Sequence, residues 1–384
     1  MPYLNKRKLK NTTLYKIALG LALACILAAL VMAVLGRLAE AGPLFVVFFV
    51  ALAIGFKGYE NLKRFSYTVI IFAAVSLAMY YPSHFVAYGD FKFSSLITPL
   101  IQLIMFGMGT SMSLHDFAGV VKTPKGVFIG VTSHFIIMPT IGFTLATISH
   151  FPPEIAAGMI LIGCSPNGMA SNVISYLAKA NLALSITITA VSTMLAPFLT
   201  PILMKYLAGS FIHIDTTKMM FDIFKMVIIP IGAGLIFNRL LSGKAKWLDA
   251  AMPVVSMFGI AFIIVIINAA GRDSLLTIGP LLLLLVLIHN LLGYTLGYWS
   301  GRLFKMNERD CRTMAIEVGM QNGGLASGIA KEMGKMATVG LAPAVFGPLM
   351  NVTGSVLASY WHKKPTGDAS VDKPSDIPEE VELT

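Results

Sequence analysis

One carboxylate in this chain stands where a membrane-spanning segment is predicted. Glu317 opens the run Glu-Val-Gly-Met-Gln-Asn-Gly-Gly at 317–324, within the predicted span 308–334. A charged side chain inside a bilayer is costly and usually marks an ion or substrate pathway. We therefore predict that Glu317 is a cation ligand. The alternative is a structural ion pair with Arg312, roughly one helical turn away.

A second polar interruption lies in the other half of the chain, at 164–172, and reads Cys-Ser-Pro-Asn-Gly-Met-Ala-Ser-Asn. Both interruptions contain residues that break a helix. Each break is expected near the middle of the bilayer, where an unpaired backbone amide costs several kcal/mol, so such breaks persist only along a protein-enclosed cavity. A matched pair of broken helices, one in each half, is typical of inverted-repeat secondary transporters, which bind substrate and ions between the breaks.

The composition independently indicates a membrane protein. Hydrophobic residues make up 56% of the chain and charged residues 12%, which is about half the charged share of an ordinary soluble domain. The mean hydropathy is +0.76. Cys25, Cys164 and Cys311 lie in or beside apolar segments, so we expect neither a disulfide framework nor a zinc cluster.

Apolar runs long enough to span a bilayer define the predicted elements. Twelve such runs lie near 12–36, 41–58, 65–86, 94–114, 126–149, 154–180, 182–208, 218–240, 249–271, 276–304, 308–334 and 337–361. Lys and Arg cluster on alternate loops, for example at 57–64, 122–125 and 239–246. The positive-inside rule therefore predicts that both termini are cytoplasmic. These loops account for most of the net charge of +10, and no nucleic-acid partner is expected because no basic stripe is interleaved with aromatic residues.

The two ends of the chain differ in character. The first apolar run is too long for a signal peptide and is not followed by a convincing cleavage site, so we predict a retained membrane helix. Residues 365–384 are polar, acidic and contain proline. They are predicted to form a disordered cytoplasmic tail.

Several of these segments resemble the signature segments of the bile acid:sodium symporter family. They are 164–173, 182–189, 287–290 (Leu-Ile-His-Asn), 317–322 and the closing 351–361. The resemblance extends from about residue 65 to 362. It implies an all-α integral membrane protein with a ten-helix inverted-repeat fold and two crossing discontinuous helices. The first two spans, within residues 1–60, are an addition to that pattern.

The resemblance also implies a division of the 65–362 transporter domain into a panel and a core. The panel would comprise about 65–114 and 218–271, and the core about 126–208 and 276–361. The implied function is sodium-coupled import of an organic anion by alternating access. We expect a multi-pass monomer in a bacterial inner (plasma) membrane.

Two sodium ions would be held by oxygen atoms at the breaks. In the family, one site is formed by the positions that match Ser171, Asn172, Ser185, Thr189 and Glu317. The other is formed by those that match Glu317, Val318, Met320 and Gln321, with Val318 and Met320 contributing carbonyls. Ser185 and Thr189 are four residues apart, so they share one helix face. The alternative for these two hydroxyls is a hydrogen bond back to the preceding helical turn.

One position departs from the family pattern. The segment 129–139 aligns with a family segment that usually has glutamine, a ligand of the second sodium ion, where this chain has His134. Imidazole suits transition metals rather than sodium, and it can be protonated. We therefore predict an intact first site and a second site that is weak, pH-sensitive, altered or partly replaced by a proton. The alternative is that His134 turns away and Glu317, Gln321 and the carbonyls suffice.

The substrate is predicted to be an anion. Broken helices expose helix N-termini, which carry partial positive charge and favour a carboxylate. Candidate substrate-contacting residues are Met169, Asn322, Met350 and Asn351. The family implies a small carboxylate such as pantoate or a keto acid, or a bile-acid-like steroid.

Other functional classes remain as alternatives. An ion or anion channel would favour pore-lining rings and oligomeric symmetry over two unlike breaks. A proton-coupled transporter of organic anions is a second alternative. An enzyme is not expected, because the sequence contains no Gly-x-Ser-x-Gly, His-Glu-x-x-His or paired-Asp motif.

Overall fold

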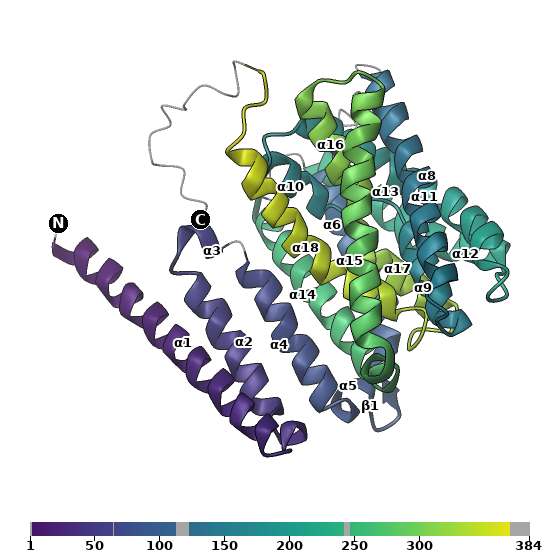
Figure 1. Ribbon diagram of the computed structural model, residues 1–384. Coiled ribbons are helices and arrows are strands. Elements are labelled where there is room, and N and C mark those ends of the chain that lie inside the picture. Colours follow the sequence, from purple (N-terminus) through teal and green to yellow (C-terminus); the bar gives the residue numbers. More distant parts are fainter. Residues whose placement is uncertain (1, 64, 113–122, 242–245, 369–384) are drawn as a thin grey trace.

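The computed structural model describes residues 2–63, 65–112, 123–241 and 246–368. This part of the chain forms a bundle of helices with one short β-hairpin (Figure 1). The N-terminal elements are α1 (Pro2–Val34), α2 (Gly42–Phe56), α3 (Glu60–Lys63), α4 (Ser66–Tyr80), α5 (Ser83–Val86), β1 (Ala87–Tyr88), β2 (Phe91–Lys92) and α6 (Ile97–Ser111). The central elements are α8 (Pro124–Ile148), α9 (Pro153–Cys164), α10 (Ala170–Leu177), α11 (Leu182–Ala208), α12 (Thr216–Ile223), the π-helical turn η4 (Phe224–Ile228) and α13 (Ile229–Leu241). The C-terminal elements are α14 (Lys246–Ala270), α15 (Arg272–Leu303), α16 (Glu308–Gly319), α17 (Gly323–Glu332) and α18 (Leu341–His362).

Each predicted span coincides with a helix, a bent helix or a broken pair of helices. Among the described residues, 7 helices are long and apolar enough to cross a membrane, and four shorter apolar helices include α2 and α9. The predicted span 218–240 corresponds to α12 and α13 joined by η4. The predicted spans 154–180 and 308–334 are the pairs α9–α10 and α16–α17. The all-α membrane fold class is thereby confirmed.

The helices of the predicted panel are in contact with one another. Helix α6 contacts α13 and α14, and α14 also contacts α4. The helices of the predicted core form a second group in which α8, α9, α11, α15, α16 and α18 interleave. The panel and core boundaries themselves stay a prediction.

The two additional N-terminal helices form a layer beside α4 (Figure 1). Helix α1 packs on α2, and α2 packs on α4. The close approach of α1 and α2 depends on small residues, since a Cβ at Gly55 would lie 2.5 Å from the Leu19 side chain and one at Gly58 would lie 2.4 Å from Tyr15. Large apolar side chains are exposed along residues 14–34 of α1, as expected for a helix facing lipid.

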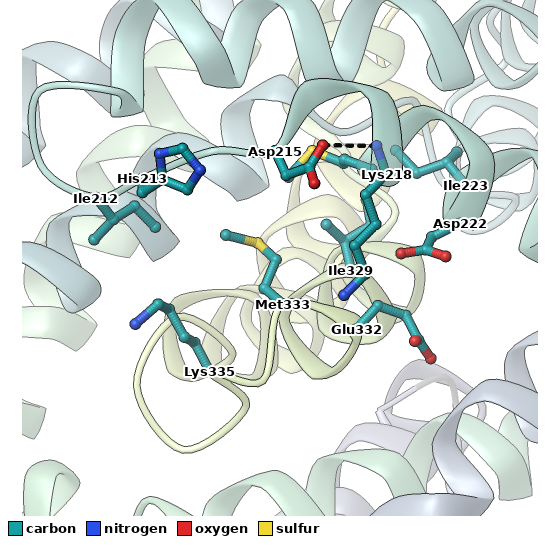
Figure 2. A pocket seen from close by; sticks show the side chains of 11 residues that line it. Ile212, His213, Asp215, Lys218, Asp222, Ile223, Ile329, Glu332, Met333 and Lys335 are labelled. Carbon is teal, nitrogen blue, oxygen red and sulfur yellow. Dashed lines mark hydrogen bonds between the residues drawn. The ribbon is translucent and has the colours of Figure 1, made fainter.

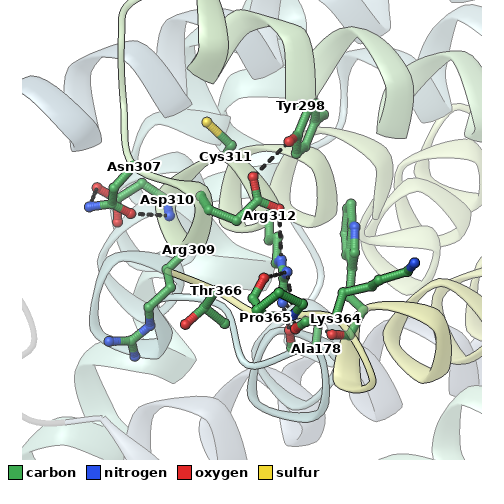
Figure 3. Close-up of polar contacts among 12 residues, drawn as sticks. Ala178, Tyr298, Asn307, Arg309, Asp310, Cys311, Arg312, Lys364, Pro365 and Thr366 are labelled. Atoms are coloured by element: carbon green, nitrogen blue, oxygen red, sulfur yellow. Dashed lines mark hydrogen bonds and ion pairs between the residues drawn. The ribbon is translucent and has the colours of Figure 1, made fainter. Parts of the chain in front are cut away.

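A buried arginine joins several helices at the end of the bundle that contains Lys305, which we call the predicted cytoplasmic end. The side chain of Arg312 is 1% exposed, and its Nε lies 3.0 Å from Glu308 Oε1. Its terminal nitrogens donate hydrogen bonds to the carbonyl oxygens of Ala178, Trp361 and Pro365 (Figure 3). Arg312 thus connects α16 with the ends of α10 and α18.

The start of the predicted tail also contacts this end. Pro365 accepts a hydrogen bond from Arg312 at 2.7 Å, Thr366 is buried, and Asp368 forms an ion pair with Arg309 at 2.8 Å. These contacts attach the first residues of that segment to α16. Residues 369–384 lie outside the described residues.

Candidate functional site

The two predicted breaks are present, and they cross. Helix α9 ends at Cys164 and α10 begins at Ala170, while α16 ends at Gly319 and α17 begins at Gly323. Between the half-helices, Asn167 and Gln321 form an antiparallel β-bridge, and the Asn322 N–H donates to the Pro166 carbonyl at 2.8 Å. The two halves of the chain therefore meet backbone to backbone at the crossing.

Local sequence accounts for the break after α9. Pro166 has no N–H and disfavours a helical conformation in the residue before it, so α9 cannot continue. Gly168 leaves room for the other break, because a Cβ there would lie 2.7 Å from the Gln321 carbonyl oxygen. The proline ends the helix, and the glycine allows the crossing.

Polar side chains from neighbouring helices cap the free helix ends at the crossing. Thr200 Oγ1 donates to the Cys164 carbonyl at 2.7 Å, and Asn290 Nδ2 donates to the Gly319 carbonyl at 2.9 Å. Asn322 caps the start of α17, since its Oδ1 accepts from the Leu325 N–H at 3.0 Å. These bonds pair backbone groups that would otherwise be orphaned in an apolar interior.

The residues predicted for the first sodium site lie together around Glu317. Its Oε1 is 2.5 Å from Ser185 Oγ, and its Oε2 is 2.9 Å from Thr189 Oγ1. Asn172 Oδ1 lies 2.8 Å from the same Ser185 hydroxyl, and Ser171 Oγ lies 3.3 Å from Thr189 Oγ1. Side-chain oxygens from α10 and α11 thus gather around one buried carboxylate of α16. Hard cations prefer such oxygen ligands.

Over the described residues, the structure shows neither of two alternatives raised from the sequence, an ion pair between Glu317 and Arg312 or hydrogen bonds from Ser185 and Thr189 back to their own helix. The guanidinium of Arg312 pairs with Glu308, and none of the ion pairs among the described residues includes Glu317. The Ser185 and Thr189 hydroxyls point across to Glu317. By contrast, Thr193, one turn further along α11, bonds back to the Thr189 carbonyl at 2.7 Å.

The residues predicted for the second site lie at the end of α16. Val318 and Met320 are buried, and the Val318 carbonyl accepts from Gln321 Nε2 at 3.0 Å. Within the described part of the chain, the buried amide oxygens Gln321 Oε1 and Asn167 Oδ1 have no hydrogen-bond partner. An unpaired buried acceptor is costly, so these two oxygens fit a cation that would pair them. Asn167 is absent from the site predicted from sequence.

His134 faces the breaks and does not turn away from them. Its Nε2 lies 2.9 Å from the Ser165 carbonyl oxygen, and its Nδ1 lies 3.2 Å from the Glu317 carbonyl oxygen. The ring is fully buried. His134 therefore contacts the C-terminal ends of both α9 and α16.

The four predicted substrate-contacting residues have different surroundings. Met169 is exposed just before α10, whereas Met350 is buried with its sulfur 3.4 Å from the Gln321 backbone nitrogen. Asn351 Nδ2 donates to the Gly347 carbonyl of its own helix at 3.1 Å. Asn322 is the helix cap described above. Met350 and Asn322 lie at the crossing, and the Asn351 amide turns back to α18.

A separate pocket of about 410 Å³ lies at the opposite end of the bundle, which we call the predicted outer end, between α12 and α17 (Figure 2). Figure 2 shows Lys218 and Asp222 of α12 opposite Glu332 of α17. None of the residues predicted for the sodium or substrate sites lines this pocket. It belongs to the contact between predicted panel and predicted core.

Comparison with known proteins adds independent information. A family model described as the sodium bile acid symporter family matches residues 98–278. An uncharacterized sodium-dependent transporter of Bacillus subtilis, YocS, is 38% identical over 316 residues, which cover 82% of this chain and 96% of that protein. A probable sodium/metabolite cotransporter of Arabidopsis thaliana chloroplasts, BASS1, is 31% identical over 263 residues, 68% of this chain and 66% of that protein. The ileal sodium/bile acid cotransporter of Mus musculus is 31% identical over 255 residues, 65% of this chain and 72% of that protein.

Proposed function

We propose that this chain, which belongs to the sodium bile acid symporter family, is a sodium-coupled symporter that imports an organic anion by alternating access. The relatives described above are sodium-dependent transporters and not enzymes. The observation that carries the proposal is the contact of the Ser185 and Thr189 hydroxyls with the Glu317 carboxylate beside the crossing, with the Asn172 amide oxygen in contact with the same two hydroxyls. A buried carboxylate without an ion-pair partner among the described residues requires a cation to remain ionised. Sodium at this place would supply that charge and would connect the two halves of the chain.

The contacts between predicted panel and core support alternating access. Helix α17 contacts α6, α12 and α14 near the predicted outer end, whereas the main neighbours of α10 and α16 are other core helices. Thr98 of α6 donates to Glu332 of α17 at 2.5 Å, and a Cβ at Gly328 would meet the Ile101 side chain at 2.2 Å. We take this arrangement as the state closed to the outside, with substrate access from the cytoplasm.

Our proposal for the substrate is an organic carboxylate, either a small metabolite such as pantoate or a keto acid, or a bile-acid-like steroid. The half-helices α10 and α17 begin at the crossing and direct their partial positive charge there. Bound sodium would add to this positive field. We further propose a monomer in a bacterial inner membrane, with cytoplasmic termini and two coupling ions.

Flux measurements in proteoliposomes test this function. Uptake of carboxylates by the purified full chain should saturate with substrate concentration and should require an inward sodium gradient that potassium does not replace. Non-saturating flux would indicate a channel, and uptake driven by an inward proton gradient without sodium would indicate a proton-coupled transporter. Either result would contradict the proposal.

A further inference from the structure

We propose that Asn167 supplies its amide oxygen to the second sodium ion, and that His134 acts as the positioning residue that orients this amide. The inference rests on the proposed sodium-coupled function and names a ligand for it. Asn167 comes from the first break, so the second ion would be held by both breaks and not by the second break alone.

The orientation of the Asn167 amide is fixed by an acceptor. Its Nδ2 donates a hydrogen bond to the carbonyl oxygen of Glu317. A carbonyl oxygen only accepts, so the nitrogen of the amide must face it. The amide oxygen consequently points away from this bond, and it has no partner among the described residues although Asn167 is fully buried.

The imidazole of His134 reinforces this orientation. Asn167 Nδ2 also lies 3.2 Å from His134 Nδ1, and His134 Nε2 lies 2.9 Å from the Ser165 carbonyl oxygen. A neutral ring with its proton on Nε2 donates to the Ser165 carbonyl and accepts from Asn167 through Nδ1. The Glu317 carbonyl oxygen, 3.2 Å from Nδ1, then receives its hydrogen bond from Asn167 and not from the ring. Both ring nitrogens are then engaged, so neither is free to bind sodium. His134 holds the amide and leaves the ligand role to Asn167.

Gln321 provides the matching half of the site. Its Nε2 donates to the Val318 carbonyl at 3.0 Å, which by the same reasoning turns Oε1 away from that bond. Gln321 is paired with Asn167 in the antiparallel bridge. Residues directly opposite in such a bridge project to the same face, with their Cβ atoms about 4.5–5.5 Å apart. Two unpartnered, buried amide oxygens therefore lie on one face of the crossing.

The surrounding backbone favours a cation at this place. The carbonyls of Glu317 and Val318 belong to the last turn of α16, where the helix dipole places partial negative charge. Each carbonyl oxygen has a second lone pair available beyond the bond it already accepts. Side-chain amide and backbone oxygens of this kind are ligands for a hard cation.

Asn290, a neighbouring buried asparagine, differs from Asn167 in that both its amide nitrogen and its amide oxygen have hydrogen-bond partners. Asn290 is also buried and also donates to the end of α16, through the Gly319 carbonyl at 2.9 Å. Its Oδ1 accepts from Thr353 Oγ1 at 2.6 Å, so both ends of this amide have partners. Asn290 thus provides a matched control for Asn167.

The test is the sodium-dependent melting temperature of the purified full chain in detergent, with choline replacing sodium at constant ionic strength. At high sodium, the slope of melting temperature against the logarithm of sodium concentration is proportional to the number of ions bound to the folded protein. We expect Asn167→Leu to have about half of the wild-type slope, and His134→Ala to have a slope between the two. Asn290→Ala should melt at a lower temperature with the full slope.

A wild-type slope in Asn167→Leu would overturn the proposal while leaving the sodium-coupled function intact. If Asn167→Leu does not fold, Asn167→Ser, whose shorter side chain cannot reach the position of the amide oxygen, replaces it and must show the reduced slope. A wild-type protein whose melting temperature does not respond to sodium would instead contradict the proposed function itself. The two failures are therefore distinguishable.

Discussion

The hydroxyl of Ser185 on α11 lies 2.5 Å from a carboxylate oxygen of Glu317 on α16. The two residues are 132 positions apart and belong to opposite halves of the chain. Their contact joins α11, which follows the first broken pair, to the first half of the second pair. Binding of an ion here would therefore link both halves of the predicted core.

We expect Ser185→Ala and Thr189→Val each to weaken sodium binding by about tenfold, because each removes an oxygen that contacts the Glu317 carboxylate. The readout is the sodium concentration that gives half-maximal thermal stabilisation. Thr193→Val is the matched control, since its hydroxyl bonds only to the Thr189 carbonyl of its own helix among its described contacts. An equal loss of sodium affinity in Thr193→Val would contradict a specific role for the two hydroxyls.

The sequence allowed prediction of the spans and the breaks because each depends on local chemistry. Apolar runs of bilayer length mark the helices, and Pro166 and Gly168 mark a place where a helix cannot continue. The position of Glu317 inside a predicted span made it a candidate functional residue without any knowledge of its partners. The family resemblance grouped it with Ser185 and Thr189, and in the structure the hydroxyls of both residues contact its carboxylate, while their role as sodium ligands stays a prediction.

Replacement of the buried arginine at the predicted cytoplasmic end should destabilise the protein. Arg312→Ala removes the ion pair with Glu308 and the donors to four backbone carbonyls, so we expect a loss of roughly 2–4 kcal/mol in the free energy of unfolding. The measurement is the thermal or denaturant unfolding of the purified protein.

Arg302→Ala provides the comparison for this arginine. The Arg302 side chain is 49% exposed and lies 3.7 Å from the same Glu308 carboxylate, so its loss should cost less than about 1 kcal/mol. Equal stabilities of the Arg312 and Arg302 variants would show that the buried contacts of Arg312 contribute little.

Locking the predicted outer end should stop transport. Thr98 of α6 and Glu332 of α17 are in hydrogen-bond contact across the predicted panel and core. We expect the double variant Thr98→Cys with Glu332→Cys to lose uptake when oxidised and to recover it when reduced. Asn181→Cys with Asp310→Cys, a pair within the predicted core, should continue to transport when oxidised. Unchanged uptake after complete crosslinking of the first pair would contradict alternating access between panel and core.

Other features of the site could not be predicted because they depend on three-dimensional proximity. Thr200 and Asn290 read as isolated polar residues in apolar helices, and only the crossing brings them to the ends of α9 and α16. Asn167 reads as a turn residue beside Pro166. Its role becomes visible only when Gln321 lies opposite and both amide oxygens are without partners among the described residues.

The contacts of Arg312 illustrate the same limit. The sequence offered Glu317 as a partner at one-turn spacing, but in the structure Arg312 pairs with Glu308 and with carbonyls from α10, α18 and the segment after α18. The ends of three separate helices determine this environment. Spacing along a single helix does not contain that information.

Sodium binding by the Glu317→Gln variant tests the central claim most directly. Glutamine keeps the size of the side chain but removes the charge that the coupling ions require, so we predict at least about 100-fold weaker sodium affinity, equivalent to roughly 2.7 kcal/mol, and no sodium-driven uptake. Glu154→Gln, which alters a carboxylate paired with Lys335 at the predicted outer end, should retain sodium binding. Sodium-dependent thermal stabilisation of Glu317→Gln at wild-type affinity would contradict the assignment of this carboxylate as the ligand at the centre of the transport site.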